Sequence, residues 1–183
     1  MSRYIRPKIP GASVFLTVIL VDRGADTLVR QIEVLRQAVR VTRAKRPFGI
    51  DAWVVLPDHM HCVWTLPEGD ADFSGRMAEI KGQFTRAVRR SGPAPTLLPT
   101  QNQKTSIQNP YGAIGGRVRV GAGPDLRSEA PIWQKRFWEH HIRDARDYDA
   151  HVRYCWNNPV KHGFVKRPED WPYSSYRRDR DGT

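Results

Sequence analysis

The stretch IDAWVVLPDHMHCVWTL, residues 50–66, decides the fold of this chain. Two short apolar runs, residues 50–56 and 61–66, are joined by Pro57 and Asp58, which leave no room for a helix. Short runs rich in β-branched and aromatic residues on either side of a tight turn are typical of an antiparallel hairpin. We therefore predict two paired strands that meet at this turn.

Further regular elements surround the hairpin. Residues 14–21, VFLTVILV, are apolar at both odd and even positions, which predicts a central strand buried on both faces. Residues 26–44 place Leu28, Ile32 and Leu35 at helical spacing, and residues 73–90 repeat this pattern. Both segments predict amphipathic helices with arginine-rich outer faces.

The composition changes at residues 91–131, where Pro, Gly, Ser, Thr, Gln and Asn dominate and apolar periodicity disappears. We treat this segment as a flexible insertion within a single domain that spans residues 1–183. After it we expect a strand at 136–142 and a helix at 145–158 that is ended by Pro159. This order predicts an α+β fold of the ferredoxin-like or RRM-like split-βαβ type, with a four- to five-stranded antiparallel sheet, packed helices and one sheet face free.

Composition limits the class of function. The 183 residues suit one domain, and 30 Lys and Arg against 19 Asp and Glu give a net charge of +11, which favours a polyanionic partner. No apolar run approaches the roughly 18 residues of a membrane span, so we expect no membrane partner. The N-terminus lacks the apolar core of a signal peptide, so we expect a cytoplasmic protein whose Cys62 and Cys155 remain thiols.

The triplet His59-Met60-His61 is the most informative candidate site. On a strand, residues i and i+2 project to the same face, so both imidazoles can bind one cation while Met60 points into the core. The same triplet also fits a plain hairpin with two half-exposed histidines. A third ligand is available on the predicted helix, where Tyr154 and Asn158 lie one turn apart. Taken alone, Tyr154 also fits an interfacial aromatic residue, and Asn158 a helix-terminal residue before proline.

These groups together suit transfer of a phosphoryl group to a phenol. A phenol has an ordinary pKa near 10, so it attacks phosphorus poorly unless a cation stabilises the growing negative charge. A tyrosine nucleophile exchanges one phosphodiester-like bond for another at little net free energy. It therefore permits cutting and rejoining of a strand without ATP, whereas an activated water would only cut.

Three stretches carry a resemblance to a known family: AWVVLPDHMHCVWTLPEGDADFSGRMAEIKGQF, WQKRFWEHHIRDARDY and HVRYCWNNPVKHGFVKRPEDWPYSSY. They resemble the REP-associated tyrosine transposases, a branch of the single-tyrosine HUH transposases. The resemblance implies that His59, His61 and Asn158 bind Mg²⁺ or Mn²⁺ and that Tyr154 is the nucleophile of a 5′-phosphotyrosine link. It also implies a single-stranded DNA substrate with REP hairpins, and we expect a monomer rather than a dimer.

Basic residues predict the DNA contacts. Lys and Arg neutralise phosphates, and nearby aromatic residues, among them Trp133 and Trp138, are able to stack on bases, although most tryptophans are expected in the core. We expect His140, His141 and His162 to be structural. The residues predicted to bind DNA are Arg3, Arg6, Lys8, Lys81, Arg86, Lys135, Arg136, Arg177 and Arg178.

Two alternatives to a DNA strand transferase remain open. One is a metal nuclease that uses water, with Tyr154 structural. The other is a catalytically inert nucleic-acid-binding module, because this sheet topology also serves RNA recognition. The absence of an aromatic RNP1-like strand argues against RNA as the ligand.

Overall fold

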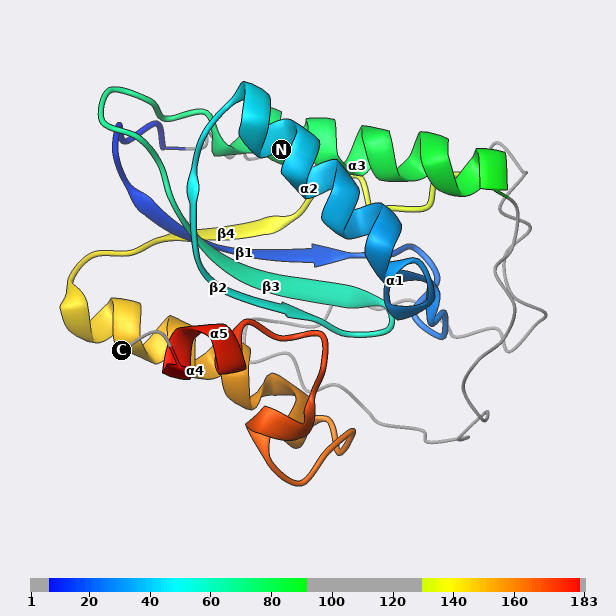
Figure 1. Ribbon diagram of the computed structural model, residues 1–183. Coiled ribbons are helices and arrows are strands. Elements are labelled where there is room, and N and C mark those ends of the chain that lie inside the picture. The colour runs from blue at the N-terminus through cyan, green and yellow to red at the C-terminus, as the bar shows by residue number, and fades with distance from the viewer. Residues whose placement is uncertain (1–6, 92–129, 182–183) are drawn as a thin grey trace, which may run out of the picture.

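The computed structural model describes residues 7–91 and 130–181 and has the predicted α+β architecture (Figure 1). Its four antiparallel strands form one sheet in the order β2-β3-β1-β4. Strands β1 and β2 lie on either side of β3 and run in the same direction as each other. Strands β3 and β4 are related in the same way on either side of β1, which is the split-βαβ topology. The strands are β1 Ser13–Ile19, β2 Gly49–Val55, β3 His59–Thr65 and β4 Trp138–His141, and the helices are α1 Thr27–Arg30, α2 Ile32–Lys45, α3 Phe73–Ser91, α4 Ala145–Lys161 and α5 Tyr176–Asp181, with a 3-10 helix at Pro168–Asp170.

Helices α2 and α3 cover one face of the sheet (Figure 1). Every second residue of the central strands points toward them, so Leu16 and Met60 are buried against Leu35, Ile80 and other apolar residues of these helices. Burial of each such side chain contributes about 1.5–3 kcal/mol to the free energy of folding. This layer supplies most of the hydrophobic core.

Helix α4 covers the opposite face, so the expectation of a free sheet face is wrong. Phe15, Val54 and Val63 point to this side and are buried together with Val152 and Cys155 of α4. The helix covers the sheet because these apolar groups leave water only when α4 and the sheet meet. The site therefore lies between a sheet and a helix rather than on an open surface.

The end of α4 also differs from the prediction. The helix continues through Pro159 and ends at Lys161. A proline removes only one backbone donor, and the amides of Gly163 and Phe164 bond the carbonyls of Val160 and Pro159, which is a Schellman motif. Gly163 has φ +72° and is the residue that permits this end.

Smaller differences concern element boundaries. The predicted helix at 26–44 is interrupted at Gln31, where φ is −106° and ψ is 31°. The last strand is shorter than 136–142. The insertion expected at 91–131 lies almost wholly outside the described residues. Of the helices in the described ranges, none has the length and apolarity that a bilayer crossing requires.

Candidate functional site

The two histidines of the triplet lie side by side on β3. Their ring centroids are 5.1 Å apart, and Met60 between them points into the core on the opposite face. Antiparallel pairing places His61 opposite Thr17 of β1. Alternation along the strand thus brings both imidazoles to one face of the sheet, as predicted, and α4 covers this face.

Each imidazole is held through its Nδ1 atom. Thr17 Oγ1 lies 2.8 Å from His61 Nδ1, and Asp58 Oδ1 lies 2.5 Å from His59 Nδ1. Asp58 also pairs with Arg23 at 3.2 Å. Partners at Nδ1 orient a histidine so that Nε2 is directed toward a ligand. His61 Nε2 is buried and has no hydrogen-bond partner among the described residues.

One stripe of α4 lies over the histidine pair. The Tyr154 ring centroid is 5.1 Å from that of His61, and the His162 ring centroid is 5.2 Å from that of His59. Asn158 lies midway between Tyr154 and His162 on the same stripe, one helical turn from each. The helix therefore carries Asn158 across the two imidazoles.

Asn158 is the most unusual polar residue of this region. It is 1% exposed, and within the described part of the chain neither Oδ1 nor Nδ2 has a hydrogen-bond partner. An unpaired buried amide costs about 1–3 kcal/mol. Together with the unpartnered Nε2 of His61, the amide oxygen offers a nitrogen and an oxygen ligand that a divalent cation would satisfy.

Burial favours the neutral forms of His61 and His162, because it lowers the pKa of both. Burial lowers the pKa of His61 well below its usual value, and the charges of His59, His162 and Lys161 act in the same direction. Burial and the neighbouring His59 lower the pKa of His162 to about 4. Neutral imidazole is the form that binds metals.

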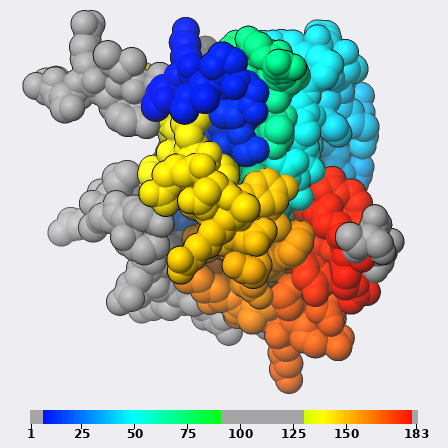
Figure 2. All heavy atoms as spheres, turned by 90° about the vertical axis from the view of Figure 1, so that its left-hand side faces the viewer, coloured from blue at the N-terminus to red at the C-terminus, as the bar shows by residue number. Residues whose placement is uncertain are grey.

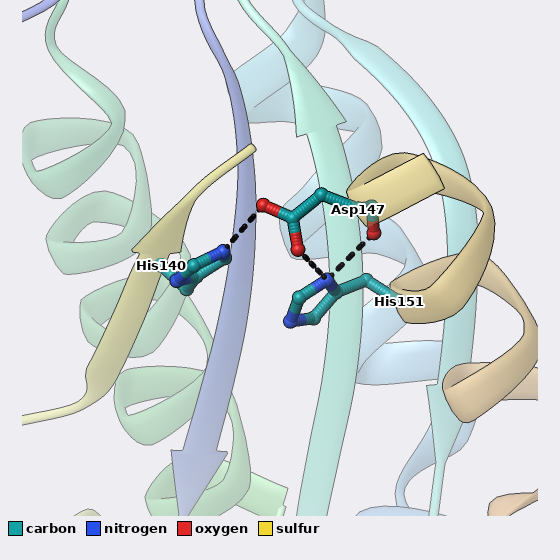
Figure 3. A group of neighbouring side chains, drawn as sticks. All are labelled: His140, Asp147 and His151. Carbon is teal, nitrogen blue, oxygen red and sulfur yellow. Dashed lines mark hydrogen bonds and ion pairs between the residues drawn. The ribbon is translucent and has the colours of Figure 1, made fainter. Parts of the chain in front are cut away.

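A second group of possible metal ligands lies on the same side of the sheet (Figure 3). His140 of β4 and Asp147 and His151 of α4 offer ligand atoms that all lie within 4.8 Å of one another, a grouping consistent with a divalent cation. Phe15 separates it from the histidine pair, with ring centroids 4.7 Å from His151 and 5.6 Å from His61.

The atoms of this second group satisfy one another. Asp147 Oδ2 accepts hydrogen bonds from Arg143 at 3.0 Å and pairs with His140 Nε2 at 2.8 Å. His151 Nδ1 bonds the Asp147 main-chain carbonyl at 2.8 Å. Hydrogen bonds to Arg143 and His140 hold the pKa of Asp147 well below its usual range. The group thus ties β4 to the start of α4, whereas unpartnered atoms remain at His61 and Asn158.

The residues predicted to bind DNA are not gathered at one place. Arg3 and Arg6 lie outside the described residues, and Lys8 is exposed on the N-terminal segment, which lies beside the segment around β4 (Figure 2). Lys81 and Arg86 are on α3, on the sheet face opposite α4. The Lys81 ammonium donates to the Gln134 carbonyl at 2.8 Å.

The remaining predicted contacts lie near the C-terminal half. Lys135 and Arg136 are exposed before β4. Arg177 donates to the Glu169 carbonyl at 2.9 Å, and Arg178 donates to the Ile50 carbonyl at 2.9 Å. Their role in DNA binding stays a prediction. Of the two tryptophans named for stacking, Trp133 is buried and Trp138 is 37% exposed.

Sequence reasoning missed three groups of the site. Asp58 was treated only as a turn residue, although its position directly before His59 allows the hydrogen bond observed. The contact of His162 with His59 was not foreseen, although His162 follows Asn158 by one helical turn. Thr17 could not be identified from local sequence patterns, because its contact with His61 depends on the pairing of β1 with β3.

The chain is similar in sequence to known proteins over nearly its whole length. The chain is 44% identical over 179 residues to a REP-associated tyrosine transposase of Escherichia coli K12, covering 98% of this chain and 85% of the relative. It is 38% identical over 180 residues to a putative REP-associated tyrosine transposase of Haemophilus influenzae, covering 98% and 88%. No protein-family model matches the sequence.

The fold also matches a solved structure of the REP-associated tyrosine transposase bound to a REP hairpin. The TM-score is 0.74 with 43% sequence identity, and the match covers 99% of this chain and 86% of that chain. Such agreement in sequence and structure over nearly the whole length relates the proteins as homologues.

Proposed function

This chain belongs to the REP-associated tyrosine transposases, and we propose that it cuts and rejoins single-stranded DNA beside a REP-type hairpin. Tyr154 is the proposed nucleophile, and His59, His61 and Asn158 are the proposed ligands of Mg²⁺ or Mn²⁺. The proposal is carried by one observation: Tyr154 of α4 and His162, directly after its end, lie against the two imidazoles of β3, with Asn158 between them on the same stripe.

The donor set fits a divalent cation. Asn158 Oδ1 and His61 Nε2 are buried without partners in the described residues, and Asp58 orients His59 through Nδ1. A cation bound there supplies polarisation of the phosphoryl oxygen and stabilises negative charge during the transfer. Imidazole ligands suit Mn²⁺ better than Mg²⁺, so we expect Mn²⁺ to support activity at least as well. The second group, around Asp147, is the weaker candidate because its own hydrogen bonds already satisfy it.

Tyr154 is positioned to attack a phosphodiester that lies over the histidines. Its Oη forms a bond to phosphorus, the bond from phosphorus to the 3′ oxygen breaks, the phenol loses its proton and the leaving 3′ oxygen gains one. The product is a 5′-phosphotyrosine ester and a free 3′ hydroxyl. Attack by a 3′ hydroxyl on this ester reverses the step and rejoins a strand, so no nucleotide cofactor is consumed.

The Tyr154→Phe variant tests the proposal. Wild type and variant are incubated with a labelled single-stranded DNA that carries a REP-type hairpin, in Mn²⁺ or Mg²⁺, and are analysed on denaturing gels. We expect a covalent protein–DNA adduct with wild type and none with the variant. Tyr148→Phe is the matched control, because Tyr148 is also on α4 and packs against the same apolar cluster as Tyr154. Tyr148 lines a pocket beside Asp51, whereas the Tyr154 ring contacts that of His61.

Each alternative gives a different gel. Equal cleavage by wild type and Tyr154→Phe, without an adduct, would select hydrolysis by water and refute the proposed nucleophile. Binding without cleavage in any divalent cation would select the inert module. Action as a monomer is part of the proposal, and dilution of the protein should leave the adduct yield per chain unchanged.

A further inference from the structure

Lys161 is the last residue of α4, and its ammonium group lies over the ring of Tyr154. The distance from Nζ to the ring centroid is 5.4 Å. Side chains of a helix lean toward its N-terminus, which is how Lys161 reaches back almost two turns. The lysine is exposed, so this contact with the ring leaves its charge accessible to a ligand.

Lys161 lies close to the proposed catalytic groups. The Tyr154 ring that its ammonium contacts is 5.1 Å from the ring of His61, measured between centroids. One ammonium is thus placed beside the phenol and near the imidazole pair of β3. Within the described residues Lys161 makes no ion pair with a carboxylate. The nearby carboxylate Asp58 is engaged by His59 and Arg23.

An accessible ammonium beside a phenol and a pair of imidazoles is suited to bind an anion. The partner that fits is a phosphodiester, which carries one negative charge on two non-bridging oxygens and gains charge as a nucleophile approaches phosphorus. Lysine serves this role as a movable point charge with three donors. The ring of Tyr154 holds the ammonium loosely through a cation–π contact, so it is already near the attacking atom.

We propose that Lys161 is a catalytic residue that donates a hydrogen bond to a non-bridging oxygen of the phosphodiester attacked by Tyr154. The proposal rests on the function proposed above and adds a phosphate-binding group to it. Its alternative is structural: a lysine in the last turn of a helix interacts favourably with the helix dipole and would stabilise α4 without touching substrate.

The rate of adduct formation in a single turnover distinguishes the catalytic role of Lys161 from the structural one. We expect Lys161→Gln to slow it by about a hundredfold to a thousandfold, as for loss of one donor to a developing oxyanion. Lys161→Arg should retain most of the rate. Affinity for the hairpin DNA should fall by less than about threefold, because many other cations contribute to binding. The control is Lys166→Gln, since Lys166 is an exposed lysine of the loop after α4.

Restoration of the charge provides the decisive measurement. Lys161→Cys, alkylated with 2-bromoethylamine, regains an ammonium on a side chain of nearly the original length. Cys62 and Cys155 are both 0% exposed, and burial raises the pKa of each thiol, so the new thiol is the one that reacts. We expect alkylation to recover the rate of adduct formation.

The outcomes separate this inference from the proposed function. If Tyr154→Phe abolishes the adduct but Lys161→Gln forms it at the wild-type rate, the lysine proposal is refuted and the nucleophile stands. Failure of alkylation to restore a slowed Lys161→Cys variant that keeps the wild-type melting temperature refutes it as well. Adduct formation by Tyr154→Phe would refute the proposed function itself.

Discussion

Asp58→Asn should weaken the binding of Mn²⁺ to the free protein. The Asp58 side chain is 11% exposed, with Oδ1 2.5 Å from His59 Nδ1 and Oδ2 3.2 Å from Arg23 Nε. The amide preserves the shape of the side chain but removes its charge. It therefore replaces a charge-assisted hydrogen bond by a neutral one, a loss of about 1–2 kcal/mol.

Part of this loss appears directly in metal affinity. In the proposed site the carboxylate orients the His59 ring so that Nε2 would face the cation, so removal of its charge should act mainly on cation binding. The unpaired Arg23 then repels the cation and adds to the effect. Because about 1.4 kcal/mol corresponds to tenfold, the dissociation constant for Mn²⁺ should rise by roughly 5- to 30-fold.

The assay is titration of the metal-free protein with Mn²⁺, followed by the electron paramagnetic resonance signal of the free ion, without DNA. Asp22→Asn is the control for net charge, because Asp22 lies in the loop after β1 and its side chain accepts a hydrogen bond from the Gly24 amide in the same loop. Equal Mn²⁺ affinity of wild type and Asp58→Asn, with His59→Ala also unchanged, would refute His59 as a ligand.

Two further predictions concern stability. Gly163→Ala should lower the free energy of unfolding in urea by about 1 kcal/mol, because Gly163 has φ +72° and no atom within 4 Å of the added carbon; an unchanged midpoint would contradict this account of the helix end. Hydrogen bonds from the buried Arg76 lower the pKa of Asp70 to about 2, whereas its value in the unfolded chain is near 4. The resulting stabilisation of the folded state is therefore complete above pH 4 and is lost as the pH falls toward 2. We expect about 1 kcal/mol from this pair, after allowance for the partly exposed carboxylate, and Asp70→Asn should remove that part of the acid dependence of urea unfolding.

Local sequence patterns predicted the regular elements well. The apolar run at 14–21 and the hairpin at 50–66 became β1, β2 and β3, and the helical spacing at 73–90 became α3. Such patterns are reliable because the pleat of a strand and the turn of a helix decide which side chains share a face before any tertiary contact forms.

The errors arose where distant contacts decided the outcome. Pro159 was expected to end α4, but the bonds that follow it and the left-handed Gly163 moved the end to Lys161. The free sheet face was expected because the sequence does not state where a helix docks. In the structure, α4 packs on that face because Val152 and Cys155 are buried there against apolar residues of the sheet.

The sequence by itself determined that His59 and His61 share one face and that Tyr154 and Asn158 share one helical stripe, since both follow from backbone repeats of two and of about 3.6 residues. Only the tertiary structure decided that the two faces meet, that Thr17 and Asp58 hold the imidazoles, and that Lys161 reaches the ring of Tyr154. These contacts depend on strand pairing and on the packing of α4 against the sheet, and burial of apolar surface far from the site positions both.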